Sequence, residues 1–293
     1  MNTTKSRKLK RYVRNVFLRA LWITISPVLR RLATSKFISL TCLRWDGGGA
    51  QIHARYSVET FARTFGFNYW QQSITTVLPK TSDSILQNWN ALIGQSLEEI
   101  NQIPAGTLTK TNGLGDALFK ALIARLRRIP IILVLDQCHN FTDVFPGKLA
   151  FYAPEFRERA EKALCSWEKE FKKPTPHIVM HLRRGLISDG SDSLRVTPDA
   201  NVLHQIAMLN RLYPGEKIKV FCFQTEPELE RVLPDNVEFD SNSSEFEVVL
   251  SCSRAKVFVM AKSSLSYVAG LLNPNTVYYQ EFWHPKIDEW KKI

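Results

Sequence analysis

The feature that most constrains this fold is the alternation of short apolar runs and helix-patterned stretches between residues 178 and 279. Strands are predicted at 178–182, 218–223, 237–239, 257–260 and 276–279. Helices are predicted between them, at 199–212, 226–232, 246–253 and 266–272. This order is typical of a parallel sheet with helices on both faces, whose ligands bind beyond the carboxyl ends of the strands. The sequence therefore predicts an α/β fold with a site at that edge of the sheet.

The first half of the chain has a weaker pattern of the same kind. Strands are predicted at 37–44 and 129–136, and helices at 51–65, 114–128 and 154–172, the last beginning at Pro154. Residues 71–112 predict one or two helices and no more. The run Lys172-Lys-Pro-Thr-Pro-His177 breaks regular structure, so we place a domain boundary at 174/175. With 293 residues, the chain fits a basic segment at 1–35 and two α/β lobes at 36–174 and 175–293.

The positive charge of the chain is concentrated at its start. The formal net charge is +11, and residues 1–36 contain ten Lys and Arg but no Asp or Glu. The remainder holds 29 basic and 28 acidic residues, so it has no general attraction for a polyanion. Nucleic-acid binding through residues 5–31 is therefore the least favoured function, and we expect no nucleic-acid partner.

Residues 5–31 predict an amphipathic helix, with apolar residues recurring at three- and four-residue steps. Pro27 is expected to stop or kink this helix near Ser26. The uncharged run Ala20–Leu29 is about half the length of the roughly 20 residues that span a bilayer. A basic face beside Leu, Phe and Trp22 indicates a peripheral anchor on an anionic membrane surface. A cleaved export signal and a solvated helix stay open as alternatives.

The cysteines bear on the compartment. Cys42, Cys138, Cys165, Cys222 and Cys252 are odd in number and include no C-x-x-C pair, so they predict neither a zinc site nor a disulfide framework. Four of the five lie in or beside apolar runs, which is typical of buried reduced thiols. We therefore expect a protein of a reducing compartment, cytoplasmic and peripheral on the membrane.

Two predicted strands end in residues suited to an anion. His181-Leu-Arg183-Arg184-Gly follows one strand directly, and adjacent guanidinium groups match the paired oxygens of a diphosphate. Ala-Lys-Ser263-Ser264 follows another strand and opens a helix, where hydroxyls and free backbone amides could hold the same group. Both strand ends therefore predict a diphosphate site.

These motifs are similar to those of a known family. His181–Gly185 resembles the H-x-R-R-G-D motif of the α-1,2-, α-1,6- and protein O-fucosyltransferase superfamily. Ala261–Leu272 resembles that family's (S/T)-S-x-S-x-x-A segment, and Gly47–Ala54 is similar to its Gly-rich Q-x-H turn. Residues 70–175 show no such resemblance. The resemblance implies a GT-B-like fold of two Rossmann-like lobes with parallel sheets facing across a cleft, 36–174 on the acceptor side and 175–293 binding the nucleotide sugar.

The resemblance also implies an activity. It implies a metal-independent, inverting glycosyltransferase without a cofactor that moves fucose from GDP-fucose to a glycan or glycolipid acceptor. The chain has no D-x-D motif, which fits a site where arginine neutralises the diphosphate. Carried over residue by residue, Arg184 with Arg183 would hold the diphosphate and stabilise the leaving group. His181 would shape the donor pocket, and Ser263 and Ser264 would bind phosphate or nucleotide.

The resemblance places Gly48, Gly49 and His53 at the cleft between the lobes. The triple glycine between a strand and a helix would let a ligand approach the helix start. The alternative is a tight connection with no ligand.

The catalytic base is less well defined, because Leu186 stands where the family has Asp. Asp189 and Asp192 lie a few residues further on and are the predicted base that takes the acceptor proton. Asp46 and His53 are rivals for that role.

Each assignment has an alternative from the residues alone. The two arginines could form structural ion pairs with carboxylates such as Asp189, Asp240 or Glu245, and the two serines could be an ordinary helix N-cap. The loss of the motif's aspartate could mark a transferase fold without catalysis, a module that binds a nucleotide sugar or a glycan.

Overall fold

The structure is a computed structural model. It describes residues 3–34, 37–44, 46–78, 82–95, 107–111, 114–135, 139–172, 176–184, 195–224 and 226–293, with the side chains of 3–15, 114, 115 and 140 excepted. The chain forms two compact units. Unit 1 comprises Met1–Arg44, Ala54–Ser73 and Ile100–Leu149, and unit 2 comprises Trp45–His53, Ile74–Glu99 and Ala150–Ile293. The boundary expected at 174/175 stays a prediction.

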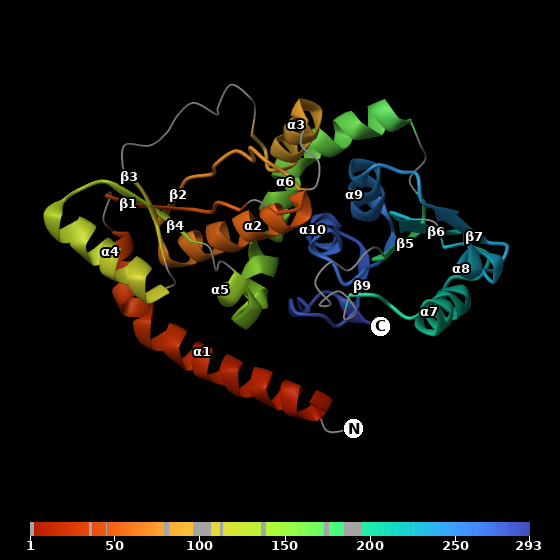
Figure 1. Cartoon of the computed structure of the whole chain (residues 1–293), viewed down its shortest axis with the longest axis horizontal. Helices are drawn as coiled ribbons and strands as arrows, with labels where there is room; N and C mark the ends of the chain where they lie inside the picture. The colour runs from red at the N-terminus through yellow and green to blue at the C-terminus, as the bar shows by residue number, and fades with distance from the viewer. Residues whose placement is uncertain are drawn as a thin grey trace. The chain divides into compact units, whose positions relative to one another are not determined.

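Unit 1 is built on a four-stranded parallel sheet. Its strands are β1 (Ile38–Thr41), β2 (Asn68–Tyr69), β3 (Thr107–Lys110) and β4 (Ile131–Val134), in the order β2-β1-β4-β3. The helices of this unit are α1 (Thr3–Ala33), α4 (Leu114–Arg127), α5 (His139–Val144) and the larger part of α2 (Gly48–Phe65) (Figure 1). Side chains from α1, β1, α2, α4 and α5 share one hydrophobic core.

The second half of α1 belongs to this core. Trp22 lies edge-on to Phe61 and Phe141, with ring centroids 5.5 and 5.3 Å away, and Leu29 and Leu32 are buried beside it. Of the stop or kink expected at Pro27, the stop is wrong, because α1 continues through Pro27 to Ala33, and the kink stays a prediction. The proline removes one backbone hydrogen bond, and burial of the apolar residues that follow it offsets that loss. Among the described residues, no helix combines the length and the apolar character needed to cross a bilayer.

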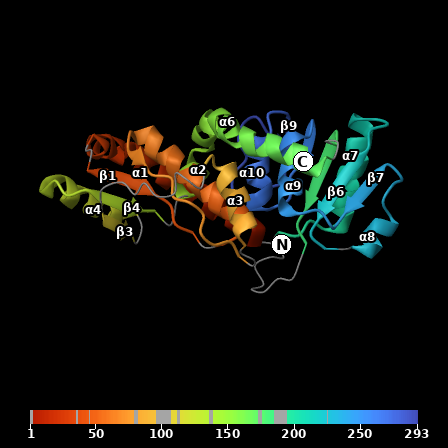
Figure 2. The ribbon, with the colours of Figure 1, turned by 90° about the horizontal axis from the view of Figure 1, so that it is seen from above.

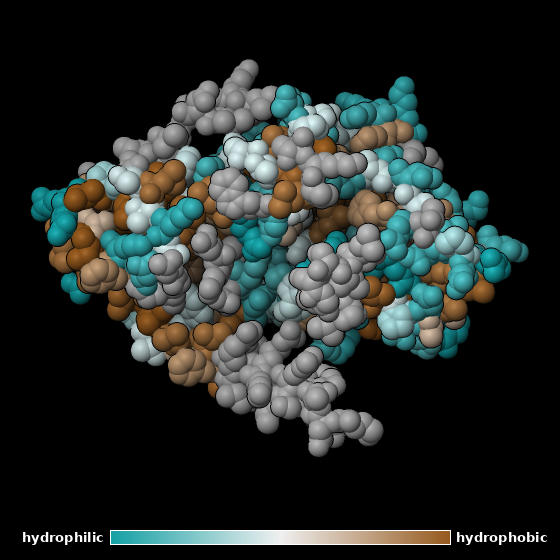
Figure 3. Space-filling model, viewed as in Figure 1, coloured by the Kyte–Doolittle hydropathy of each residue, from teal (hydrophilic) through white to brown (hydrophobic). Residues whose placement is uncertain are grey.

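α4 packs with its small residues inward. Ala117, Ala121 and Ala124 are buried, whereas Phe119 and Leu126 are exposed. Leu122 and Ile129, which follows the helix, are exposed as well. Figure 3 shows the resulting hydrophobic surface over α4. A surface helix normally buries its large apolar residues and exposes its polar ones.

Unit 2 is built on a six-stranded parallel sheet with the order β7-β6-β5-β8-β9-β10. Its strands are β5 (Ile178–Leu182), β6 (Ile218–Cys222), β7 (Val237–Asp240), β8 (Val257–Val259), β9 (Thr276–Tyr279) and β10 (Lys291–Lys292). Numbered along the chain from β5, this is the 3-2-1-4-5-6 order of the Rossmann fold. The strand order reverses between β5 and β8, so that pair is the topological switch point where ligands of such sheets bind.

Helices cover both faces of this sheet. The helices of the unit are α3 (Asp83–Leu92), most of α6 (Pro146–Phe171), α7 (Asp199–Leu212), α8 (Pro227–Arg231), α9 (Glu245–Arg254) and α10 (Ser264–Leu272), together with the first six residues of α2. Ile178, Met180 and Leu182 of β5 pack in a core with Val202 and Ile206 of α7. The alternate residue His181 points to the other face and contacts α10. Figures 1 and 2 show α7 and α9 on opposite sides of β5 and β6.

The predicted α/β class, with two parallel sheets, is confirmed. In unit 2 the predicted bounds agree to within two residues for every strand and helix after residue 176 except the short β10, which was missed. The prediction that a helix begins at Pro154 is wrong, because α6 begins at Pro146 and contains Pro154. The expected helix from residue 51 begins three residues earlier, so Gly48 and Gly49 are part of α2.

Candidate functional site

The two motif segments lie side by side at the switch point of the unit 2 sheet. β5 and β8 are adjacent, with Met180 opposite Val259. Beyond these positions β5 continues into His181 and Arg183, and β8 leads to Ser263 at the start of α10. The structure therefore brings the two sequence motifs to the place where the fold predicts a ligand.

His181 is buried and is held by α10. Its Nδ1 lies 2.6 Å from Oγ of Ser266, and that oxygen also accepts the backbone N–H of Ala261 at 3.1 Å. If Ser266 donates its hydroxyl hydrogen to Nδ1, the ring proton of His181 lies on Nε2. Nε2 is itself buried and has no hydrogen-bond partner among the described residues. His181 therefore presents a buried ring nitrogen that the surrounding described groups do not satisfy.

Burial also fixes the charge of this imidazole. Desolvation, together with the positive charge of Arg183, lowers the pKa of His181 to about 3. The ring is therefore neutral at physiological pH.

The start of α10 is lined by serines. Ser263 is the N-cap, and its hydroxyl accepts the backbone N–H of Leu265 at 3.2 Å. The predicted N-cap alternative for the serines is thus present at Ser263. The helix is nine residues long and has no acidic residue in its first turn, so the positive end of its dipole is not neutralised locally. An anion near Ser264 would be stabilised by that field.

The space beside the two glycines at the start of α2 is already occupied by neighbouring residues. A Cβ at Gly49 would lie 2.6 Å from Cα of Leu265, and one at Gly48 would lie 2.1 Å from a ring carbon of Trp89. Both glycines are buried, and Gln51 donates to the backbone oxygens of Asp46 and Thr76 at 2.7 and 2.6 Å. These contacts correspond to the tight connection that the sequence left open. Close packing against α3 and α10 accounts for the glycines without a ligand.

Arg184 is engaged by the protein itself. Its guanidinium donates to the carbonyl of Thr197 at 2.5 Å and to the carboxylate of Asp199, and Glu226 lies 3.8 Å from its Nε. The side chain is almost fully buried. The alternative of a structural ion pair is therefore realised, with Asp199 and Glu226 in place of the acids considered from the sequence. The predicted contact of Arg184 with a diphosphate stays a prediction.

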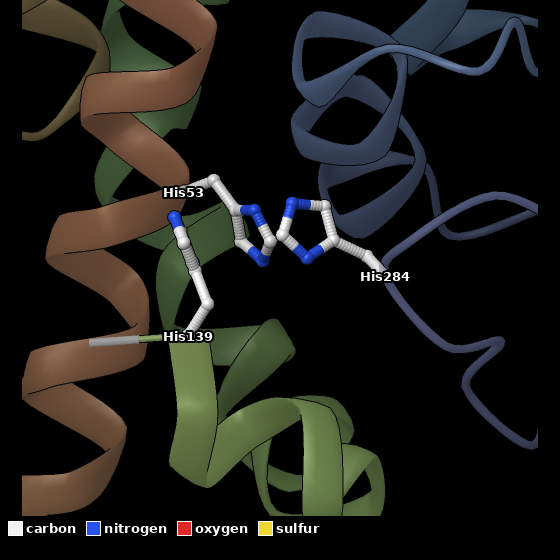
Figure 4. A group of neighbouring side chains, drawn as sticks. All are labelled: His53, His139 and His284. Carbon is white, nitrogen blue, oxygen red and sulfur yellow. The ribbon is translucent and has the colours of Figure 1, made fainter. Parts of the chain in front are cut away.

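His53 packs in an aromatic cluster of unit 2. Its ring centroid lies 4.2 Å from that of His284, edge to face, and 4.5 Å from that of Tyr267 on α10. Figure 4 shows the His53 and His284 rings against each other. His53 and His284 are both buried. This packing gives His53 a structural environment, and its predicted role as a rival base stays a prediction.

His139, also labelled in Figure 4, belongs to unit 1. Its Nε2 accepts from the guanidinium of Arg44 at 3.2 Å, because arginine can only donate. Its Nδ1 lies 3.4 Å from Oγ of Ser57. Both ring nitrogens of His139 therefore have contacts within unit 1.

The predicted catalytic bases Asp189 and Asp192 lie outside the described residues, as do Gly185 and Leu186. Ser266 is a functional candidate that the sequence reasoning did not assign, although the S-x-S spacing after β8 marked it. Asp199 was also missed as a partner of Arg184, because nothing local in the sequence relates a helix start to an arginine 15 residues before it.

Comparison with known proteins gives structural similarities only. No family model matches the chain, and no curated protein matches it in sequence. In structure it is similar to E. coli heptosyltransferase WaaC with ADP-2-deoxy-2-fluoro heptose, at 12% identity and a TM-score of 0.42, covering 87% of this chain and 92% of that one. It is also similar to NodZ α-1,6-fucosyltransferase co-crystallized with GDP, at 14% identity and a TM-score of 0.39, covering 80% and 92%. The same values for fucosyltransferase NodZ from Bradyrhizobium are 14%, 0.36, 80% and 93%.

Proposed function

We propose that this chain is a glycosyltransferase that moves a sugar, fucose from GDP-fucose, to a hydroxyl group of a glycan or glycolipid acceptor. The observation that carries the proposal is the switch point of the unit 2 sheet. There the buried Nε2 of His181, without a partner among the described residues, lies beside the serine-lined start of α10. The resemblance of both segments to fucosyltransferase motifs supports the choice of donor.

The proposed reaction is a single displacement. The acceptor oxygen forms a bond to the anomeric carbon while the bond from that carbon to the diphosphate oxygen breaks, so the configuration at the carbon inverts. The proton of the acceptor hydroxyl passes to a base, for which Asp189 or Asp192 is proposed. The negative charge that grows on the diphosphate is stabilised by donors arranged in advance, with Ser263, Ser264 and the dipole of α10 as the proposed contacts.

His181 has a defined part in this scheme. The ring is neutral, and the contact of Nδ1 with Ser266 fixes its orientation. In the proposed tautomer Ser266 donates to Nδ1 and the ring N–H is at Nε2. A fixed donor costs no reorganisation when the charge develops. We propose that His181 orients the donor substrate by this hydrogen bond.

Variants of the ion pair between Arg184 and Asp199 can test whether Arg184 binds the diphosphate. If the diphosphate is a second ligand of Arg184, the carboxylate of Asp199 competes with it. Asp199→Asn then binds GDP as tightly as the parent chain or more tightly, while Arg184→Ala lowers turnover by about 10²–10³-fold. If the pair is only structural, Arg184→Ala and Asp199→Asn lower the unfolding temperature together, and the GDP affinity of the folded protein is unchanged in both.

The proposed function is tested first by binding. A ligand that binds only the folded state raises the unfolding temperature, so GDP, UDP and ADP are compared at equal concentration. We expect a shift selective for GDP, followed by release of GDP from GDP-fucose when glycan acceptors are added. A shift selective for UDP would support a glycosyltransferase but would exclude GDP-fucose as its donor. Binding without transfer to any acceptor would favour the inactive module.

We also propose a cytoplasmic location on a membrane surface, with residues 5–31 as contacts. The uncompensated basic residues of this segment support it. One part of the expectation is corrected, because Trp22 is buried in the core of unit 1 and so does not contribute to an apolar membrane face.

A further inference from the structure

The net charge of the chain is divided unequally between the two units. Unit 1 contains 19 Lys and Arg but only four Asp and Glu, a net charge of +15. Unit 2 contains 20 basic and 24 acidic residues, a net charge of −4. Of the four acids in unit 1, Glu59 pairs with Arg63 and Asp116 pairs with Lys120. Unit 1 therefore carries the whole cationic excess and attracts an anionic partner.

The same unit exposes large apolar side chains on α4. Phe119 is 64% exposed and Leu126 is 69% exposed, and Leu122 lies between them at helical spacing on the same face. Ile129 extends the apolar residues past the end of the helix. We call these four residues the α4 stripe. Exposing Phe and Leu while burying Ala costs solvation free energy in water, so this face is suited to an apolar environment.

Arginines lie beside the α4 stripe. Arg125 and Arg127 are in the last turn of α4, and Arg128 follows directly. The guanidinium of Arg125 donates to the backbone carbonyl of Arg31, which joins the end of α4 to the last turn of α1 with its Arg30 and Arg31. Four arginines of two helices, together with Arg128, are thus gathered near one end of the stripe.

We propose that unit 1 docks on an anionic lipid bilayer through the α4 stripe, with these arginines on the lipid phosphates. Apolar side chains next to cations match the boundary between headgroups and acyl chains, where each half meets its preferred environment. A nucleic acid would engage the cations but leave Phe119 and Leu126 in water. The proposal does not depend on the donor chemistry of unit 2, and either can fail alone.

The test is sedimentation of the full chain with vesicles. Vesicles of phosphatidylglycerol and phosphatidylethanolamine are compared with vesicles of phosphatidylcholine alone, at low and high salt. We expect binding to the anionic vesicles that weakens with salt and is absent on phosphatidylcholine. The double variant Phe119→Ser, Leu126→Ser is expected to lower the partition coefficient at least tenfold. Arg127→Glu is expected to lower it and to reduce its dependence on salt.

A matched control comes from unit 2, where Phe151 is 71% exposed and Leu212 is 53% exposed. Phe151→Ser, Leu212→Ser removes the same side-chain types from exposed helix positions and is expected to bind vesicles as the parent does. Equal loss in both double variants would overturn the assignment to the α4 stripe, and so would undiminished binding of Phe119→Ser, Leu126→Ser. Circular dichroism confirms that each variant is folded.

Two other partners would also overturn the proposal. In light scattering without vesicles, a dimer that the double variant converts to a monomer would identify the stripe as a contact between copies of this chain. Binding to duplex RNA that exceeds vesicle binding, and that Phe119→Ser, Leu126→Ser leaves intact, would identify a nucleic-acid surface.

Discussion

Replacing Trp22 by alanine tests whether α1 is part of the fold of unit 1. Its indole is packed against Phe61, Phe65 and Phe141, with ring centroids 5.5, 6.2 and 5.3 Å away. A buried tryptophan removes about 150–250 Å² from water, which at about 25 cal/mol per Å² corresponds to roughly 4–6 kcal/mol. Large-to-small substitutions of buried aromatic residues cost about 3–5 kcal/mol in measured series.

One term acts in the opposite direction. Nε1 of Trp22 is buried without a hydrogen-bond partner among the described residues, and an unsatisfied donor costs about 1–3 kcal/mol. Removing the indole relieves that cost, so we expect Trp22→Ala to lower the free energy of unfolding by about 3 kcal/mol. Trp22→Phe keeps an aromatic ring and removes the donor, and we expect a change of less than about 1 kcal/mol.

The assay is urea unfolding followed by far-ultraviolet circular dichroism, with Phe17→Ala as the matched control. Phe17 is on the same helix and is 66% exposed, so its loss is expected to change stability by no more than about 0.5 kcal/mol. An unchanged midpoint for Trp22→Ala, or an equal loss for Phe17→Ala, would refute the reasoning. An unchanged midpoint would also mean that α1 adds nothing to the stability of unit 1.

Two further predictions concern unit 2. Gly49→Ala is expected to destabilise the chain by more than about 1 kcal/mol, because its Cβ would meet the backbone of Leu265. The control is Gly147→Ala in unit 1, whose Cβ would meet no neighbouring atom within 4 Å, and it is expected to be neutral or stabilising in thermal unfolding. For His181, the pKa in the folded state is about 3, below its unfolded value, so the unfolded state binds more protons between these values. The neutral His181 therefore leaves the free energy of unfolding at its full value above about pH 6.5. As the pH falls from there toward 3, the free energy of unfolding decreases by about 1.4 kcal/mol per pH unit. Melting temperatures at pH 7.5 and 4.5 should therefore differ more for the parent than for His181→Gln, and equal differences would contradict the assignment.

The elements that could be predicted from the sequence are those with a strong local pattern. β5 is buried along its whole length, so it reads as a continuous apolar run that ends at His181. β2 and β10 have two residues each, too few for any periodicity, and both were missed. Proline is typical of a helix start, but Pro154 lies in the interior of α6. No local feature of the sequence shows that the helix begins at Pro146 instead.

The position of the two strand ends that form the candidate site could be predicted from the sequence, but the contacts of their side chains could not. Strand ends mark where ligands bind in parallel sheets, and the sequence located both strand ends of the switch point correctly. The pairing of Arg184 with Asp199 and Glu226 depends on where α7 and α8 lie in three dimensions. Periodicity likewise shows that α4 has an apolar face and a face of alanines, but it does not say which one is turned to the core.

The order in which the chain visits its two units has a consequence for how such a protein can diversify. The path changes units five times, at 44/45, 53/54, 73/74, 99/100 and 149/150, and two of these passages lie within the continuous helices α2 and α6. A gene recombined at any single breakpoint therefore encodes at least one unit whose core residues come from two different parents. New combinations of unit 1 and unit 2 must arise by point substitution or by several simultaneous exchanges, because neither unit is encoded by one continuous segment.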